Sequence, residues 1–360
     1  MIPSRNSKAI GLFAGSLDSI LAFKLITEQH IAAVALNFRL PFSIIGRVPT
    51  DEQLQRTADF LAVNLVSLTV GDDYLEIVRA PKYGYTLQMA PCIDCMAYML
   101  KRAKELMTEI KADFVFTGEV LEQRPFSQNK RSLKLLEKIV GLEGRLLRPL
   151  SAKILEPTRP ELTGLVRRER LLGFHGRTRR RQMRLAREFG IVDYPAPGAG
   201  CLLTDSNFAA RCRDAIAHNR FNNLQEIEIL RYGRHFCLPS KAKVVVGRNE
   251  NENLVLEKII LPNSLIFKPV DTVGPVTILH SSRKTKKDME LAAQICAFYS
   301  DHLPGKSVKV VCEQHLFSVK PCKAEELADW RIIAEPTKQP TNHSEVKNDS
   351  RNKKQNKTAD

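Results

Sequence analysis

The sequence predicts an α/β domain built on a mostly parallel sheet, followed by a smaller α+β domain. Short apolar runs alternate with segments of helical spacing through the first half of the chain, and a second set of strands begins near residue 222. A chain of 360 residues with 43% hydrophobic content can bury two separate cores.

In the first part, buried strands and amphipathic helices follow one another in order. Residues 9–13 form a short apolar run, and helical spacing begins at Asp18 after a Gly/Ser turn. Strands are expected at 9–13, 31–37, 64–70 and 113–116, and helices at 18–28, 51–62 and 97–110. Parallel sheets bind ligands at the carboxyl ends of their strands. The turn at 14–19, Asn37 and residues 117–119 fall at these ends, so we expect the ligand site there.

The second part begins after a helix expected at 207–218. Strands are expected near 244–246, 265–267 and 308–311, with a helix at 289–299. Residues 336–360 are almost devoid of apolar side chains and cannot bury enough surface to fold, so we expect a disordered tail. These patterns divide the chain into domains at 1–220 and 221–335 and a tail at 336–360.

Composition limits the class of protein. The formal net charge of +15, from 55 Lys plus Arg against 40 Asp plus Glu, indicates an anionic partner such as nucleic acid or, alternatively, a generally basic surface. No apolar run approaches the roughly 20 residues of a membrane span, and the N-terminus lacks a signal-peptide pattern. We expect a cytoplasmic protein with no membrane partner, whose eight cysteines are not needed for disulfides.

The turn after the first strand is a candidate phosphate site. Its small residues, Ala14, Gly15 and Ser16, let backbone N–H groups approach a phosphate, and the following helix N-terminus adds donors and a positive dipole end. Ser19 can donate to a phosphate oxygen, and Asp18 can hold Mg²⁺. The alternative is an ordinary helix N-cap by Asp18 or Ser16.

This segment resembles the phosphate loop of the PP-loop ATP pyrophosphatases, whose pattern is Ser-Gly-Gly-x-Asp-Ser. Gly15, Asp18 and Ser19 match the pattern, whereas Ala14 and Ser16 replace its Ser and its second Gly position. The resemblance implies an adenine nucleotide alpha hydrolase-like domain that binds ATP and Mg²⁺. The change at 14 removes one phosphate donor, and a side chain at 16 would strain the loop at positive φ.

Three cysteines are candidates for the chemistry. Cys92 and Cys95 open a helix, where two thiols three residues apart can face one centre and the helix N-terminus favours thiolate. The pair alone suits a redox pair, two zinc ligands or part of an iron–sulfur cluster, and the lack of a second pair argues against a structural zinc ribbon. Cys201, in the Pro/Gly-rich loop 195–201, is either a third ligand or a small buried residue. Three thiolates on a [4Fe–4S] cluster would leave one iron open for sulfide, although the usual cluster has four Cys ligands.

Five motifs in order carry a wider resemblance over about residues 8–215. They are Pro81-Lys-Tyr-Gly-Tyr85, Pro91-Cys-Ile-Asp-Cys95 and the runs 117–128, 176–182 and 197–205. Together they resemble the ThiI-like tRNA sulfurtransferases, described as 4-thiouridine synthetases. The resemblance implies adenylation of a tRNA uridine and replacement of its oxygen by sulfur from sulfide or a persulfide carrier, with Cys92, Cys95 and Cys201 holding a cluster or delivering sulfur directly. Met96 and Ala90 replace a His and an Asn that family members tend to carry.

Further nucleotide-site candidates lie at the strand ends. Glu119, Gln123 and Arg124 follow a strand and are expected to face nucleotide or uridine, unless they form a surface ion-pair segment. Arg124 suits a phosphate because its fork matches two oxygens. Asn37 and Phe38 are expected on the adenine side. The full set is Ala14, Gly15, Ser16, Asp18, Ser19, Asn37, Phe38, Thr117, Gly118, Gln123 and Arg124.

Two segments are candidates for RNA binding. Ten arginines occupy residues 159–187, and the densest part holds Arg177, Arg179, Arg180, Arg181 and Arg184. Partly helical spacing would direct several toward backbone phosphates, unless they form a solvated helix face. The run 244–253 resembles the NFACT-R type of RNA-binding domain and would dock tRNA, with a structural or dimerisation module as the alternative. A homodimer is left open.

Three functions follow from these patterns. The first is ATP-dependent tRNA uridine thiolation to 4-thiouridine, with Cys92, Cys95, Cys201 and Asp18 as catalytic residues. The second is a tRNA-binding protein whose ATP loop has decayed, motivated by Ala14 and Ser16. The third keeps the enzyme class and changes the product to 2-thiouridine.

Overall fold

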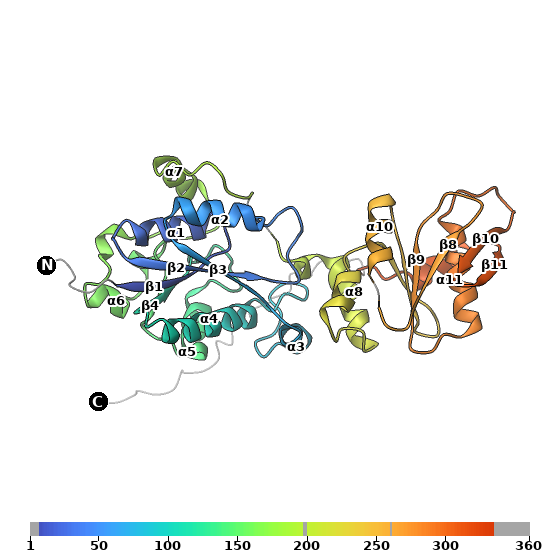
Figure 1. Ribbon diagram of the computed structural model, residues 1–360. Coiled ribbons are helices and arrows are strands. Elements are labelled where there is room, and N and C mark those ends of the chain that lie inside the picture. The colour runs from blue at the N-terminus through green and yellow to red at the C-terminus, as the bar shows by residue number, and fades with distance from the viewer. Residues whose placement is uncertain (1–6, 197–199, 260, 335–360) are drawn as a thin grey trace, which may run out of the picture.

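Two β-sheets organise the chain. The computed structural model describes residues 7–196, 200–259 and 261–334, so the predicted tail at 336–360 and part of the loop 195–201 lie outside the described residues. One sheet has five strands and the other six, and they stand side by side with α8 (Ser206–Ala217) between them (Figure 1). The predicted fold class, a parallel α/β unit followed by a smaller α+β unit, is confirmed.

The first sheet is parallel throughout, with the order β3-β2-β1-β4-β5. Its strands are β1 (Lys8–Leu12), β2 (Ala32–Arg39), β3 (Asn64–Thr69), β4 (Phe114–Phe116) and β5 (Leu146–Leu147). The chain runs outward from β1 to β3 and then crosses back to β4, so the order reverses between β1 and β4. Ligands of open α/β sheets bind outside such a reversal point, at the carboxyl ends of the strands.

Helices cover both faces of this sheet. One face carries α1 (Leu17–Thr27), α2 (Asp51–Phe60) and α7 (Arg180–Glu188), and the other carries α4 (Cys92–Glu109) and α5 (Lys130–Val140) (Figure 1). The short helices α3 (Asp73–Arg79) and α6 (Arg159–Leu162) lie at opposite ends of the sheet. Apolar side chains of β1 and β4 point alternately into the two cores, as burial on both faces requires.

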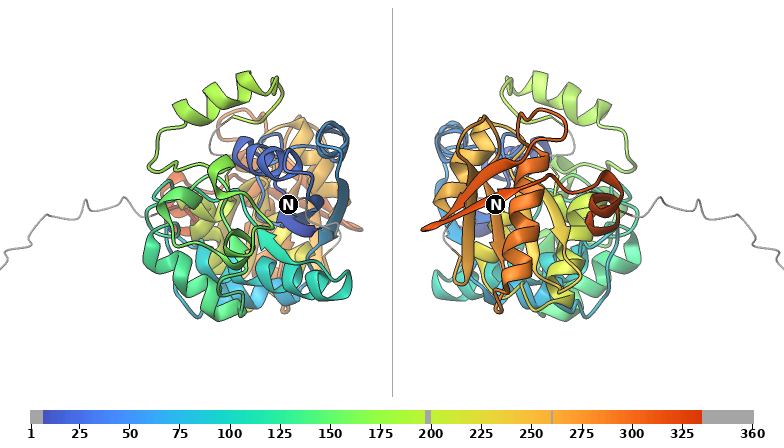
Figure 2. Two further views of the ribbon diagram at one scale, coloured as in Figure 1. Left: turned by 90° about the vertical axis from the view of Figure 1, so that its left-hand side faces the viewer. Right: turned by 90° about the vertical axis from the view of Figure 1, so that its right-hand side faces the viewer.

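The second sheet is antiparallel, with the order β11-β10-β8-β9-β7-β6. Its strands are β6 (Arg234–Cys237), β7 (Lys243–Val246), β8 (Ser264–Pro269), β9 (Thr277–His280), β10 (Val308–Cys312) and β11 (His315–Val319). The helix α11 (Lys286–Phe298) packs along one face, as Figure 2 shows. The remaining helices of this part are α10 (Glu250–Lys258) and α12 (Ala324–Trp330).

A shared apolar core joins the two sheets. The helices α8 (Ser206–Ala217) and α9 (Leu224–Ile229) contribute to it, together with residues from both units. Phe42 stacks on Phe221, with ring centroids 6.2 Å apart and planes 7° from parallel. Lys243 on β7 is buried and its Nζ lies 3.0 Å from Asp214 Oδ2 on α8. The junction is therefore packed like a domain interior, which fixes α8 against the second sheet.

Candidate functional site

The predicted phosphate turn lies at the reversal point of the parallel sheet. Gly15 has φ 63° and is buried, and a Cβ there would meet Leu54 Cδ2 at 2.7 Å. The left-handed conformation therefore falls on glycine, which tolerates it. Ser16 has φ −76° and caps α1, with its Oγ 3.5 Å from the backbone N of Ser19. The strain expected for a side chain at position 16 is absent, which corrects that expectation.

Gly118 brings β4 into direct contact with the start of α1. A Cβ at this position would lie 2.6 Å from Ser19 N and 2.7 Å from the Asp18 carbonyl carbon. Only glycine permits this approach, because the atoms it would meet belong to the backbone. The 14–19 turn and the strand end at residues 117–118, both predicted as parts of the site, are therefore in direct contact.

Asp18 lies at this contact, with one carboxylate oxygen hydrogen-bonded and the other without a partner among the described residues. Gln123 Nε2 donates to Asp18 Oδ2 at 2.9 Å, so the two candidates meet across 105 residues of sequence. Asp18 Oδ1 is buried and has no hydrogen-bond partner among the described residues. Because an unsatisfied buried carboxylate oxygen is costly, this atom is suited to receive a cation or a donor from a ligand.

Asn37 and Phe38 shape the neighbouring strand end. The buried side chain of Asn37 donates from Nδ2 to the Phe13 carbonyl at 2.7 Å, which ties β2 to the start of the turn. Phe38 is half-buried and packs against the apolar side chains of the junction. Ala14 is exposed at the tip of the turn, where it offers no hydroxyl.

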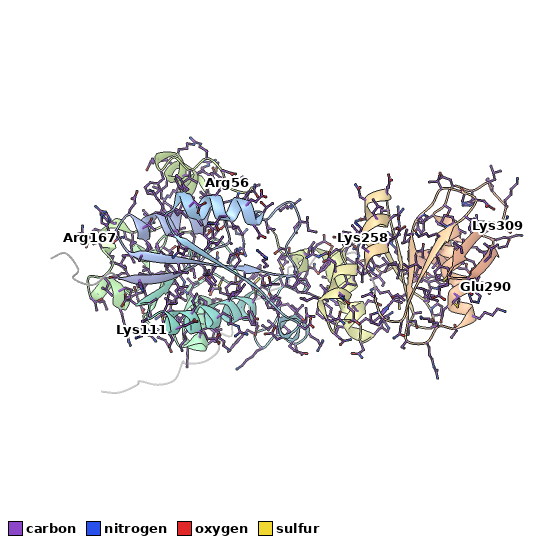
Figure 3. All side chains as sticks on the ribbon, viewed as in Figure 1. Arg56, Lys111, Arg167, Lys258, Glu290 and Lys309 are labelled. Carbon is purple, nitrogen blue, oxygen red and sulfur yellow. The ribbon has the colours of Figure 1, made fainter. Side chains whose placement is uncertain are left out.

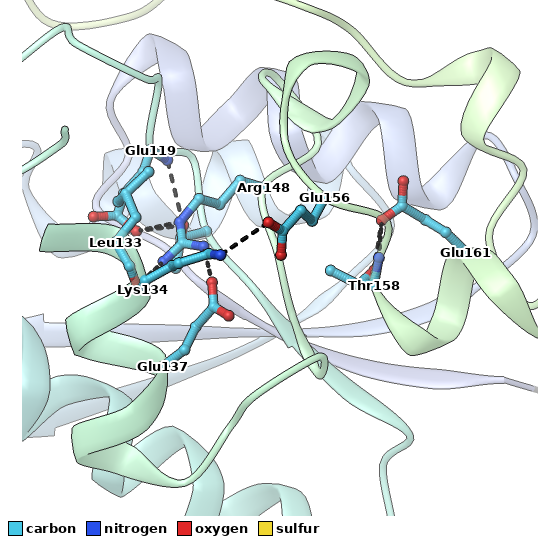
Figure 4. Close-up of polar contacts among 9 residues, drawn as sticks. Glu119, Leu133, Lys134, Glu137, Arg148, Glu156, Thr158 and Glu161 are labelled. Atoms are coloured by element: carbon cyan, nitrogen blue, oxygen red, sulfur yellow. Dashed lines mark hydrogen bonds and ion pairs between the residues drawn. The ribbon is translucent and has the colours of Figure 1, made fainter. Parts of the chain in front are cut away.

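Glu119, together with the Thr117 hydroxyl, belongs to a buried ion-pair network. Arg148 Nε donates to Glu119 Oε2 at 3.1 Å, and the same guanidinium pairs with Glu137 on α5 (Figure 4). The Thr117 hydroxyl donates to Glu119 Oε2 at 3.1 Å. Glu119 is only 5% exposed. The expectation that Glu119 faces nucleotide or uridine is therefore wrong, because its carboxylate is needed to balance Arg148.

A cleft of about 400 Å³ adjoins the turn on the α2 side. Its lining residues come from the turn itself, from the loop before α2, from α2 and from the segment that leads toward Cys201: Gly15, Gly46, Arg47, Val48, Pro49, Gln53, Thr57, Asp193, Tyr194, Pro195 and Ala196. The volume lies in the range of small-molecule sites. No sequence motif indicates this cleft, since most of its residues lie in loops.

The three predicted cysteines are brought together at the edge of the junction core. Cys92 and Cys95 open α4, and Cys201 forms an isolated bridge with Ser43. Each of the three packs against the same apolar cluster. The Met89 N–H, just before α4, donates to the Leu203 carbonyl at 3.1 Å, which ties the segment holding Cys201 to the segment before Cys92.

Two hydroxyl groups donate to these sulfurs. Tyr74 Oη lies 2.9 Å from Cys95 Sγ, and Thr86 Oγ1 lies 2.9 Å from Cys92 Sγ. Burial raises the pKa of Cys95 to about 12, and burial also raises the pKa of Cys201 to about 11. The expectation of thiolate at the helix start is therefore wrong for Cys95 in the protein alone, because desolvation outweighs the helix dipole. Tyr74 was not among the residues predicted from the sequence, where its only signal is an apolar position in a helix.

A residue of the cysteine motif fixes the loop that precedes the motif. Asp94, between the two cysteines, accepts from the backbone N of Lys82 and of Tyr83, each at 3.0 Å. This contact explains why the 81–85 and 91–95 motifs occur together, since one positions the other. Thr86 follows directly on the first motif and gains its place on Cys92 from this turn.

Arg124 lies near enough to the cysteines for its charge to act on two of them. Its positive charge lowers the pKa of both Cys95 and Cys201 against the larger effect of burial, so its guanidinium acts on both sulfurs. The adjacent residue, Gln123, contacts Asp18. One loop between β4 and α5 therefore reaches both parts of the site.

The arginine run lies on the outer helix α7, which packs against α1 (Figures 1 and 2). Arg177, Arg180, Arg181 and Arg184 are exposed, while Arg179 is half-buried. Within the described residues none of the five forms an ion pair, so their charge faces solvent. Gly176 N donates to the Leu121 carbonyl at 2.8 Å, so the run starts beside the loop that carries Arg124.

Asp214, His218 and Cys237 form a second group whose ligand atoms lie within 4.8 Å of one another. The Lys243 ammonium already pairs with Asp214 at 3.0 Å, and Arg220 adds a second positive charge that lowers the pKa of Asp214. A cation would have to displace a buried ammonium here. We therefore interpret this group as a structural ion-pair network and not as a metal centre.

Comparison with known proteins gives similarity to RNA-related and nucleotide-related structures. Residues 233–331 match the family model described as NFACT protein RNA binding domain. No curated protein matches the sequence. Among the described residues, no helix is long and apolar enough to cross a membrane.

Solved structures are similar only at a distance. A 4-thiouridine synthetase in complex with RNA and bound ATP shows 21% identity over 41% of this chain and 37% of its own, with a TM-score of 0.32. The C-terminal part of the fibronectin/fibrinogen-binding protein from Streptococcus suis shows 15% identity over 67% and 90%, with a TM-score of 0.26. A predicted tRNA methyltransferase subunit from Methanocaldococcus jannaschii shows 16% identity over 40% and 69%, with a TM-score of 0.28. These values do not establish a family or an activity.

Proposed function

We propose that this protein is an ATP-dependent tRNA uridine sulfurtransferase, with 4-thiouridine as its product. The observation that carries the proposal is the loop between β4 and α5. Gln123 in this loop holds the Asp18 carboxylate of the nucleotide turn, and the charge of Arg124 acts on Cys95 and Cys201. An activating site and a sulfur site that share one loop suit a reaction in which both act on one base.

The turn supplies the activation half of the proposal. The N-terminus of α1 and Ser19 would bind phosphate oxygens, and Asp18 would hold Mg²⁺ through its unpaired Oδ1. The uridine oxygen would attack the α-phosphate of ATP, and pyrophosphate would leave. Gly118 keeps β4 close to α1, so that the attacking base and the phosphate meet in a fixed geometry.

The cysteines supply the sulfur half. Three thiols from two segments, with hydroxyl donors on two of them and an apolar surrounding, fit an iron–sulfur ligand set. Cys92, Cys95 and Cys201 would hold a [4Fe–4S] cluster, which when bound supplies an iron with an open position for sulfide. The alternative within this proposal is a persulfide carried on one of the three thiols, with Arg124 balancing its negative charge.

Several features support tRNA as the partner. The chain carries a net charge of +15, and four unpaired arginines are exposed on and just before α7. The second unit, 221–335 in our division, matches an RNA-binding family model over 233–331. We infer that the second unit docks the tRNA and that α7 contacts its backbone phosphates.

The test is a thiolation assay with protein purified without oxygen. Unmodified tRNA, Mg-ATP and sulfide are supplied, pyrophosphate release is followed, and the nucleosides are identified by mass spectrometry. We expect RNA-dependent pyrophosphate release and 4-thiouridine, both lost in Asp18→Asn, with only the thionucleoside lost in Cys95→Ala. Appearance of 2-thiouridine would change the product but keep the class. Colourless, iron-free protein that thiolates tRNA with a persulfide donor, but not with sulfide, would favour the persulfide.

The competing function is a tRNA-binding protein with a decayed nucleotide turn. Ala14 favours it, because its position lacks a hydroxyl for phosphate. Ser16 no longer favours it, because its φ of −76° suits any residue. Binding of tRNA without any ATP binding or pyrophosphate release would select this function over the enzyme.

A further inference from the structure

Arg231 of the second unit donates two hydrogen bonds to a turn of the first unit. Its Nη1 donates to the Ser43 carbonyl at 2.9 Å, and its Nη2 donates to the Pro41 carbonyl. Only 10% of its side chain is exposed. A guanidinium that satisfies two carbonyls of one turn fixes the turn in place, because both bonds depend on the same rigid fork.

This turn, residues 41–44, pairs through backbone hydrogen bonds with the segment that carries Cys201. Leu202 N donates to the Phe42 carbonyl at 2.7 Å, and Ile44 N donates to the Gly200 carbonyl at 3.2 Å. These two bonds flank the bridge between Ser43 and Cys201. The position of Cys201 thus follows the position of residues 41–44.

The opposite side of the Cys201 segment leads to the other two cysteines. Met89 N donates to the Leu203 carbonyl at 3.1 Å, and Cys92 begins α4 three residues later. The Cys201 segment therefore lies between two supports. One is the 87–90 turn of the first unit, and the other is the 41–44 turn that Arg231 holds.

We propose that Arg231 is a positioning residue for Cys201, and that the second unit thereby completes the three-cysteine site. The inference rests on the proposed function for the role of the cysteines, but its structural content stands without it. In this arrangement Arg231 and the 41–44 turn link the second unit to the three-cysteine site. Loss of the Arg231 side chain lets Cys201 move away from Cys92 and Cys95, while both of those residues stay unchanged.

The experiment measures thiol–thiol proximity in the full chain, without iron, ATP or RNA. Wild type, Arg231→Met, Arg231→Lys and Arg248→Met are treated with dibromobimane, and linked peptides are quantified by mass spectrometry. Arg248 lies in the same unit but pairs with Glu252 and does not contact the 41–44 turn. The link between Cys92 and Cys95, within one helix, is the internal reference. Cys212 is fully buried, so its protection reports that each variant is folded.

We expect the ratio of the Cys95–Cys201 link to the Cys92–Cys95 link to fall about tenfold in Arg231→Met, since two charge-assisted hydrogen bonds are lost. Arg231→Lys should recover part of it, and Arg248→Met should equal wild type. Equal ratios in all four proteins, with Cys212 protected, would overturn the proposal, as would the absence of any Cys201 link in wild type. A failed thiolation assay leaves these ratios unchanged, so the two proposals fail separately.

Discussion

Replacement of Gly118 by alanine tests whether the close contact between β4 and α1 sets the nucleotide site. The new Cβ would lie 2.6 Å from Ser19 N, whereas ordinary contact begins at 3.4 Å. The two segments would have to separate by about 0.8 Å, the difference between these values. The obstacle is backbone that starts a buried helix, so no side-chain rotation can relieve it.

Two effects follow from that displacement. Overpacking of this kind costs about 1–3 kcal/mol of folding free energy. A shift approaching 1 Å between reacting groups costs roughly 100-fold in rate. We therefore expect Gly118→Ala to lower the free energy of unfolding by about 2 kcal/mol in urea titrations followed by circular dichroism, and to reduce RNA-dependent pyrophosphate release roughly 100-fold.

The matched control is Gly173→Ala. A Cβ at Gly173 would meet only side-chain atoms, at 3.3 Å or more, and its φ is not positive. Its stability and its pyrophosphate release should stay near wild type. If Gly118→Ala kept both its stability and its rate, the argument that this contact shapes the site would be refuted.

Three further predictions rest on charge. Arg148→Met leaves the carboxylates of Glu119 and Glu137 without their partner in a buried site. It should lower the free energy of unfolding by about 3–5 kcal/mol in the same urea titration, and a loss below about 1 kcal/mol would contradict the network. Burial raises the pKa of Cys95 from 9.0 to about 12, so the unfolded chain releases this proton first and stability should fall as pH rises from 9 to 11. The free energy of unfolding should depend less steeply on pH in Cys95→Ala than in wild type. Identical slopes in the two proteins would exclude a contribution from this thiol. Arg180→Gln combined with Arg184→Gln, on one face of α7, should reduce the salt dependence of tRNA binding by roughly one unit per lost phosphate contact. The control is Lys111→Gln, because Lys111 lies on the far side of the sheet from Arg56 and α2 (Figure 3). This variant should leave the salt dependence of tRNA binding unchanged.

Four strands of the parallel sheet and the helices α1, α2 and α4 were predicted, whereas α5 was not. Their apolar runs are buried on both faces, so the pattern in residues 9–13, 31–37 and 113–116 reports the fold directly. The shortest strand, β5 (Leu146–Leu147), was missed because two residues carry no periodicity. Strands β6, β9 and β11 were also missed.

The candidate site was predictable only where a motif is local. The spacing of Cys92 and Cys95 at a helix start and the Gly15 turn follow from neighbouring residues, because both depend on backbone geometry within a few positions. That Glu119 turns inward to Arg148 does not follow, since its partner comes from another strand end.

Sequence by itself determined the fold class, the turn at residues 14–19 and the place of Cys92 and Cys95 at a helix start, because hydrophobic periodicity and local turn chemistry depend on consecutive residues. Tertiary structure alone decided that Gln123 meets Asp18, that Tyr74 donates to Cys95, and that Arg231 holds the turn beside Cys201. The last of these contacts spans 188 residues. Such pairings arise from how the sheets and the junction pack, and one chain's sequence carries no local signal for them.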